Sequence, residues 1–269
     1  VNEHTNETTM AADKLINDFE LPFQLYDVLG TEALTEHPLF AEHSRDTFDA
    51  VLDTADKIAT NLFLPHNHLA DKNEPQFDGK KVSMIGDVKV AFDAFRDSGF
   101  IAGRYRFDDG GMQLPETIMT AVAGYFMAAN PSTTAYPFLT TAAINVISHF
   151  ASDEIKAAFM PRMLTGEFTG TMALTEPHAG SSLADIKTTA VKQDDGSYRI
   201  KGSKIYISGG DHELSDNIVH LVLAKVPGGP GGVKGISLFA VPKYRLNDDL
   251  SIGKRNDVHL TGLIHKLGY

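Results

Sequence analysis

Two short stretches of the chain place hydroxyl side chains beside tight glycine turns. The first is Met172–Ser182 (MALTEPHAGSS), and the second is Gly202–Gly210 (GSKIYISGG). The residues between them predict a hairpin, so we expect the two stretches to lie side by side. Hydroxyls and exposed backbone N–H groups in such turns can hold phosphate oxygens without a formal positive charge. The pair therefore predicts a site for a flat aromatic cofactor with a diphosphate tail.

Helical periodicity dominates roughly the first 165 residues. Apolar side chains recur there at three- and four-residue steps, and glycine, proline and capping residues mark the helix ends. The expected helices are residues 45–64, ended by Pro65; 87–98, ended by Gly99; 115–130, ended by Pro131; and one that begins at Ser152 and is limited or kinked by Pro161.

Beyond Gly166 the sequence changes to short runs of β-branched and aromatic residues broken by glycine. Asp195-Gly196 between two of these runs is a strong hairpin signal. The predicted fold class is α+β with two domains. An all-α domain, residues 1–165, precedes an all-β barrel or sandwich domain, residues 166–269. The expected strands are 168–174, 186–193, 197–201, 204–208, 218–226 and 235–241.

Composition excludes several classes of function. The formal charge of −11 argues against a nucleic-acid partner, since phosphate binding needs a concentrated basic face. The chain has no cysteine, which excludes disulfides, thiolate nucleophiles and thiolate metal sites. No run approaches the roughly 20 apolar residues of a membrane span. The polar first residues do not follow the plan of a signal peptide, so we expect a cytoplasmic location.

Histidine pairs offer no convincing metal site. His66-Asn-His68 lacks a third ligand at a recognisable spacing, and we expect it to lie solvated on a loop. The segment that begins at His212 lacks the second histidine of a zinc helix. Glycine-rich dinucleotide loops, phosphate-binding loops and serine-hydrolase elbows are absent from the sequence as well.

The two stretches resemble the flavin-binding signatures of the acyl-CoA dehydrogenase family. These are Thr-Glu-Pro-x-x-Gly-Ser, followed by Gly-x-Lys-x-Trp-Ile-Thr/Ser-x-Gly. The order and the separation agree, and similar segments extend the resemblance over most of residues 30–269. The resemblance is closest to the branch that contains methylthiopropanoyl-CoA dehydrogenase. Those further segments are residues 110–115, 136–140, 211–224 and 234–242.

The resemblance implies FAD as the cofactor and assigns residues to its site. Ser208 falls where a hydroxyl contacts flavin N5, and Tyr206 falls where many members have a tryptophan against the ring. Thr175 would face the ring, while Gly180 and Ser181 would hold the diphosphate. The full set of expected FAD contacts is Met172, Leu174, Thr175, Gly180, Ser181, Tyr206, Ile207 and Ser208.

The resemblance also implies a reaction in fatty acid metabolism. Acyl-CoA dehydrogenases convert an acyl-CoA thioester to the enoyl-CoA and pass the electrons to an electron-transfer flavoprotein. Glu176 is expected to have a structural role, because the family's base comes from a C-terminal helical bundle, which would lie beyond Tyr269. Without that bundle, we expect weak FAD retention and no turnover. Full-length members are homodimers or homotetramers.

Three alternatives remain open at this point. One is an acyl oxidase that passes electrons to oxygen. Another is a flavin-binding relative of the alkylation-response type, which binds nucleic acid through a basic face and which the charge of −11 disfavours. The third is a scaffold that keeps the fold and holds no flavin.

Overall fold

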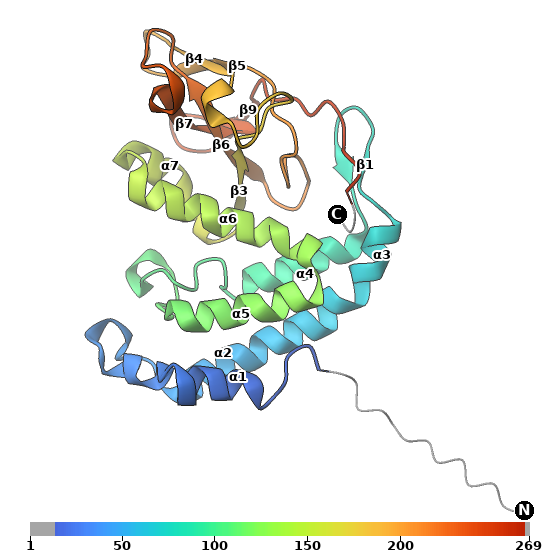
Figure 1. Ribbon diagram of the computed structural model, residues 1–269, viewed down its shortest axis with the longest axis vertical. Helices are drawn as coiled ribbons and strands as arrows, with labels where there is room; N and C mark the ends of the chain where they lie inside the picture. Colours follow the sequence, from blue (N-terminus) through green and yellow to red (C-terminus); the bar gives the residue numbers. More distant parts are fainter. Residues whose placement is uncertain (1–13, 267–269) are drawn as a thin grey trace, which may run out of the picture.

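Helices form the first part of the chain and strands most of the second (Figure 1). The computed structural model describes residues 14–266; the polar start of the chain and residues 267–269 lie outside that range. This order confirms the predicted α+β class. The α-helices are α1 Glu20–Pro22, α2 Arg45–Ile58, α3 Asn67–Lys72, α4 Gly86–Asp97, α5 Glu116–Ala129, α6 Pro131–Phe150 and α7 Asp153–Leu164.

The strands begin with a small hairpin inside the helical part and continue after α7 (Figure 1). They are β1 Gln76–Phe77, β2 Val82–Ser83, β3 Phe168–Ala173, β4 Thr189–Lys192, β5 Tyr198–Lys201, β6 Asn217–Lys225, β7 Ile236–Pro242, β8 Tyr244–Leu246 and β9 Ile252–Arg255.

Most helix ends follow the local chemistry. Ser44 and Thr47 cap the start of α2 with reciprocal hydrogen bonds, and Gly99, at φ +80°, follows the end of α4. The Asn130 side chain accepts a hydrogen bond from the Thr133 N–H and separates α5 from α6. No described helix between residues 14 and 266 has the length and apolar character needed to cross a bilayer.

The prediction that the helix beginning at residue 45 ends at Pro65 is wrong. A π-helical turn at Ala59–Phe63 and a 3₁₀ turn at Leu64–His66 carry the chain directly into α3. Proline is tolerated near the start of such a turn because its missing N–H would have no partner there. Pro161 likewise lies inside α7, which runs on to Leu164.

Four phenylalanines hold the helices together. Phe63, Phe95, Phe100 and Phe126 are buried and come from the π-helical turn after α2, from α4, from the loop that follows and from α5. The ring of Phe126 meets Phe63 at 4.8 Å and Phe95 at 4.7 Å in edge-to-face geometry. Such pairs add to the burial of large apolar surfaces, so this cluster fixes the helical layer.

Strand β6 is the centre of a five-stranded mixed sheet. It pairs with β3 in parallel on one edge and with β7 in antiparallel on the other. Strand β4 joins β6 at the Thr189–Lys225 bridge and forms a hairpin with β5, as Asp195-Gly196 predicts. Strands β8 and β9 form a separate two-stranded hairpin. The prediction of a strand at residues 204–208 is wrong, because these residues form an irregular loop.

Strand β3 lies directly on α6, and this contact joins the sheet to the helices (Figure 1). A methyl group on Gly170 would come within 2.5 Å of the Ala143 Cβ and 2.9 Å of the Met163 Cε. The Gly170 N–H also donates to the Thr140 hydroxyl at 3.1 Å. One apolar core therefore includes residues of both parts, and the division at residue 165 into two domains stays a prediction.

Gly170→Ala should destabilise the protein by about 1–3 kcal/mol, because the added methyl forces β3 away from α6. Denaturant unfolding measures this change. Adding Ala143→Gly to the Gly170→Ala protein should restore part of the lost stability, because it removes the opposing methyl. Gly231→Ala is the matched control, since Gly231 has a negative φ and open space around it. Equal effects at both glycines would contradict the close contact.

Candidate functional site

The first stretch turns sharply at the end of β3. After Ala173 the chain leaves the sheet, and Glu176 and Ala179 exchange backbone hydrogen bonds of 2.8 and 3.1 Å. Gly180 and Ser181 follow this turn. The Met172 side chain, on β3, is 37% exposed, and the Ser181 side chain is exposed as well. The turn therefore presents a hydroxyl and backbone groups to solvent at one end of the sheet.

The second stretch is a loop with an unusual backbone. Tyr206 has φ +59°, the left-handed region that a bulky aromatic residue rarely adopts. This conformation breaks the expected strand and leaves the Tyr206 side chain 57% exposed. Gly209, at φ +62°, turns the chain again. Backbone strain of this kind often occurs at functional sites, where the surrounding structure holds it in place.

The two stretches are in direct contact. The Ile205 N–H donates to the Thr175 carbonyl at 2.9 Å, and the Lys204 Nζ donates to the Leu174 carbonyl at 3.0 Å. They lie side by side, as the intervening hairpin predicts. Gly202 lets the start of the second stretch approach Thr188, at the entry to β4, because a Cβ there would lie 2.1 Å from the Thr188 hydroxyl oxygen.

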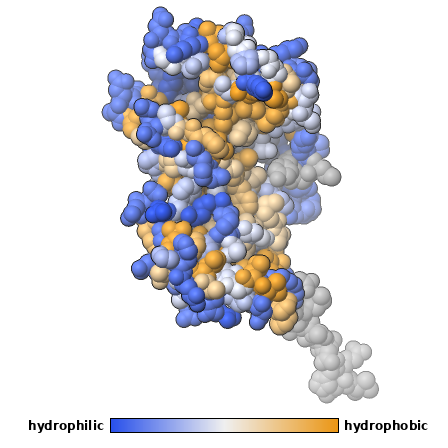
Figure 2. Space-filling view, turned by 60° about the vertical axis from the view of Figure 1, so that its left-hand side comes forward, coloured by the Kyte–Doolittle hydropathy of each residue, from blue (hydrophilic) through white to orange (hydrophobic). Residues whose placement is uncertain are grey.

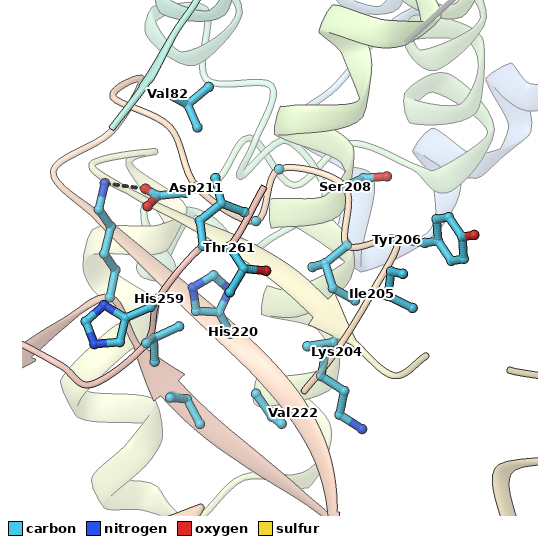
Figure 3. Close-up of a pocket in the computed structure, with 18 of the residues that line it drawn as sticks. Val82, Lys204, Ile205, Tyr206, Ser208, Asp211, His220, Val222, His259 and Thr261 are labelled. Carbon is cyan, nitrogen blue, oxygen red and sulfur yellow. Dashed lines mark ion pairs between the residues drawn. The ribbon is translucent and has the colours of Figure 1, made fainter. Parts of the chain in front are cut away.

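The second stretch borders a cleft of about 1950 Å³. Tyr206, Ile207 and Ser208 line this cleft, and Figure 3 shows Tyr206 and Ser208 on the same loop. The segment after β9 contributes His259, on the opposite side of the view from Tyr206, and Thr261, near its centre. The other five predicted FAD contacts, all within the described residues 14–266, do not line the cleft. They are Met172, Leu174, Thr175, Gly180 and Ser181.

The sequence analysis did not identify several buried polar groups that line the cleft. Asp211 lies between Lys243, at 2.7 Å, and Arg255, at 3.0 Å. On β6, the His220 Nδ1 is 2.7 Å from the Thr171 hydroxyl, and burial lowers the pKa of His220 to about 4, so the ring is neutral at pH 7. The sequence signal for His220 was a polar residue inside the otherwise apolar run of β6.

His66 differs from its prediction. It is 2% exposed rather than solvated, because the helical path continues through Pro65 and places the ring in the core. Its Nδ1 lies 2.7 Å from the Leu62 carbonyl and its Nε2 lies 2.8 Å from the Thr133 hydroxyl. Among residues 14–266, no group of three or more histidine, aspartate or glutamate side chains is arranged to hold a metal ion.

Family models match both parts of the chain. The N-terminal domain of acyl-CoA dehydrogenase matches residues 45–167, and the middle domain of acyl-CoA dehydrogenase matches residues 171–263. The chain belongs to the acyl-CoA dehydrogenase family. The middle-domain match includes both contacting stretches and most of the residues that line the cleft on the β side.

Individual acyl-CoA dehydrogenases are similar over most of this chain. The 3-methylmercaptopropionyl-CoA dehydrogenase of Ruegeria pomeroyi is 38% identical over 229 residues, which cover 85% of this chain and 39% of that protein. The broad-specificity linear acyl-CoA dehydrogenase FadE5 of Mycobacterium tuberculosis is 33% identical over 252 residues, or 91% of this chain and 41% of that protein. This chain thus spans about two fifths of the length of these relatives.

Solved structures support the fold. The acyl-CoA dehydrogenase of Geobacillus kaustophilus superimposes with a TM-score of 0.58 at 25% identity, over 74% of this chain and 48% of that one. A glutaryl-CoA dehydrogenase of Mycobacterium smegmatis gives a TM-score of 0.59 at 22% identity, over 76% and 47% of the two chains.

Glu176 connects the segments that form the candidate site. Its carboxylate is 3% exposed and accepts hydrogen bonds from the Lys187 N–H, the Thr188 N–H and hydroxyl, and the Lys204 Nζ at 2.6–3.0 Å. Burial by itself would raise the pKa of Glu176, but these bonds outweigh it and lower the pKa to about 2. Such a weakly basic, enclosed carboxylate has a structural role.

Glu176→Gln should destabilise the protein by about 3 kcal/mol near pH 7, because the glutamine amide cannot accept from all of these donors. The pKa of Glu176 lies below its unfolded value of 4.5. The carboxylate's contribution is therefore complete above pH 4.5 and is lost as the pH falls toward 2. The difference in unfolding free energy between the two proteins should shrink over that range.

Glu116→Gln serves as the control for this measurement. Glu116 pairs with Arg104 at 3.2 Å on the surface, so its loss should change stability by less than about 1 kcal/mol. A Glu176→Gln protein with the same stability and pH profile as the control would refute the role given to this carboxylate.

Proposed function

We propose that this member of the acyl-CoA dehydrogenase family binds FAD and acts in the α,β-dehydrogenation of an acyl-CoA thioester. The observation that carries the proposal is the direct contact between the two signature stretches, from the Ile205 N–H to the Thr175 carbonyl, beside a large cleft. Family membership supports the reaction class. The relatives named above act on acyl-CoA thioesters, one of them on 3-methylmercaptopropionyl-CoA, which we propose as the first substrate to test.

The residues beside the cleft fit a flavin. The Tyr206 side chain is largely exposed; the Lys266 Nζ lies over its ring at 4.3 Å from the centroid, and the remaining ring surface is open to a flat ring. Among the described residues, no group accepts a hydrogen bond from the backbone N–H of Tyr206, Ile207 or Ser208. Free donors of this kind suit the acceptor atoms of a flavin ring. The cleft is also larger than the roughly 300–1,000 Å³ of an ordinary small-molecule pocket, which leaves room for a dinucleotide.

Each proposed contact has a distinct task. Tyr206 would pack against the ring, and the Ser208 hydroxyl would donate a hydrogen bond to it. Ile207 lines the cleft and would contact the ring edge. Gly180 and Ser181, expected at the diphosphate, and Met172, Leu174 and Thr175, expected at the ring, do not line the cleft and stay predictions of the family resemblance. FAD, when bound, supplies the acceptor for the hydride that leaves the substrate's β-carbon.

No base is assigned within this chain. Glu176 is the acidic residue nearest the proposed ring contacts in sequence, but it is enclosed by donors and its pKa is lowered to about 2, so it holds a proton poorly. We propose an electron-transfer flavoprotein as acceptor, and a homodimer or homotetramer as the assembly, on the family resemblance. The cytoplasmic location stays a prediction.

The experiment is anaerobic mixing of the full-length protein, with the C-terminal helical bundle that the resemblance implies and loaded with FAD, with a panel of acyl-CoA esters that includes the 3-methylmercaptopropionyl ester. Bleaching of the visible flavin absorption is the expected result. A protein that takes up no flavin would refute the proposal and favour a scaffold. Rapid recovery of the absorption on admission of air would favour an acyl oxidase.

Ser208→Ala should slow flavin reduction by about fivefold, since loss of one hydrogen bond to the ring removes about 1 kcal/mol of stabilisation. Stopped-flow absorption measures the rate, and circular dichroism should show an unchanged fold. Ser237→Ala is the matched control, because Ser237 is an exposed serine on β7 that does not line the cleft. An unchanged reduction rate in Ser208→Ala would remove this residue from the proposed site.

A further inference from the structure

The loop that carries Tyr206 and Ser208 has no strand to hold it. We call residues 204–211 the Ser208 loop. Its backbone is irregular, and Tyr206 adopts the left-handed conformation that costs a bulky residue free energy. A loop of this kind keeps one conformation only if contacts outside its own backbone determine it. Side chains at its two ends make such contacts.

Lys204 anchors the beginning of the Ser208 loop. Its side chain is mostly buried, and its Nζ donates to the Leu174 carbonyl at 3.0 Å and to the Glu176 carboxylate at 2.9 Å. Both acceptors belong to the first signature stretch. One ammonium group therefore sets the distance between the two stretches at the point where each leaves regular structure.

Asp211 anchors the end of the same loop. Its buried carboxylate lies 2.7 Å from the Lys243 Nζ and 3.0 Å from the Arg255 guanidinium. Figure 3 marks one ion pair of Asp211 with a dashed line. Lys243 is buried too, and its Nζ also donates to the His212 carbonyl at 2.9 Å. The Lys243 backbone is itself held, because its N–H donates to the Ile218 carbonyl at 2.7 Å.

The middle of the Ser208 loop rests on the helical part. A Cβ on Gly209 would lie 3.5 Å from the Tyr136 ring of α6, which is ordinary contact distance. The same ring meets His212 edge-on at 5.2 Å. The loop is therefore bounded by an ionic anchor at each end and by an aromatic surface between them, and its exposed side chains are those of Tyr206 and Ser208.

We infer that Lys204 and Asp211 are positioning residues, which hold Tyr206 and Ser208 at the flavin by anchoring the two ends of the Ser208 loop. This inference rests on the proposed function. Buried ion pairs suit such a task, because removing one partner leaves an uncompensated charge that drives local rearrangement. Neither residue needs to touch the cofactor.

Tyr206→Trp gives a direct reporter, since the chain contains no other tryptophan. In that background, Lys204→Met and Asp211→Asn should each lower the fluorescence anisotropy of the tryptophan in the flavin-free protein. Hydrogen exchange of the loop amides should become about tenfold faster, while circular dichroism stays unchanged. After FAD is added, quenching of the tryptophan should show at least about tenfold weaker binding, and the flavin potential should shift.

Glu167→Gln is the matched control. Glu167 forms an ion pair with Arg162 at the junction of α7 and β3, away from the Ser208 loop. The Glu167→Gln substitution should leave the tryptophan anisotropy, the hydrogen exchange of the loop amides and FAD binding unchanged. Anisotropy and exchange in Lys204→Met and Asp211→Asn equal to those of the control would overturn the inference. A full-length protein that binds no FAD would refute the proposed function, while the flavin-free measurements on Tyr206→Trp still decide whether the anchors hold the loop.

Discussion

One buried carboxylate, that of Glu176, joins the segments from which the candidate site is built. It accepts hydrogen bonds from the backbone that enters β4, from the Thr188 hydroxyl and from Lys204. A carboxylate is suited to this position because it offers about four acceptor sites and no donor. An apolar side chain there would leave several buried donors without partners, which is costly. The geometry of both signature stretches depends on this group.

The rigid sheet and the strained Ser208 loop have separate roles in this fold. Strand β6 is almost entirely buried between β3 and β7, and β3 rests on α6 through Gly170. This layer supports the Ser208 loop, whose backbone departs from regular structure at Tyr206. Loops on a rigid scaffold are common places for binding residues, because the scaffold supplies the stability that the loop lacks. The left-handed Tyr206 is therefore understandable as a conformation that its surroundings impose.

Charge in the cleft differs from charge in the whole chain. The protein carries a formal charge of −11, yet two cations that line the cleft, Lys243 and Arg255, are matched by the carboxylates of Asp211 and Glu213. His212 and His220 are held neutral by burial, which lowers the pKa of His212 to about 3 and that of His220 to about 4. Net charge says little about such a local environment. On the face seen in Figure 2, apolar residues gather over part of the β region beside strongly hydrophilic ones.

The sequence by itself determined the order of helices and strands, the Asp195-Gly196 hairpin and the family, because periodicity, turn residues and short motifs are local properties. It could not show that Tyr206 breaks the expected strand, that Pro65 lies within a continuous helical path, or that His66 is buried. It also missed Asp211 and Lys243, which meet only when β7 and the Ser208 loop are folded together. Only the tertiary structure decided these points, because each depends on partners that are distant in the chain, and tertiary contacts override local preference.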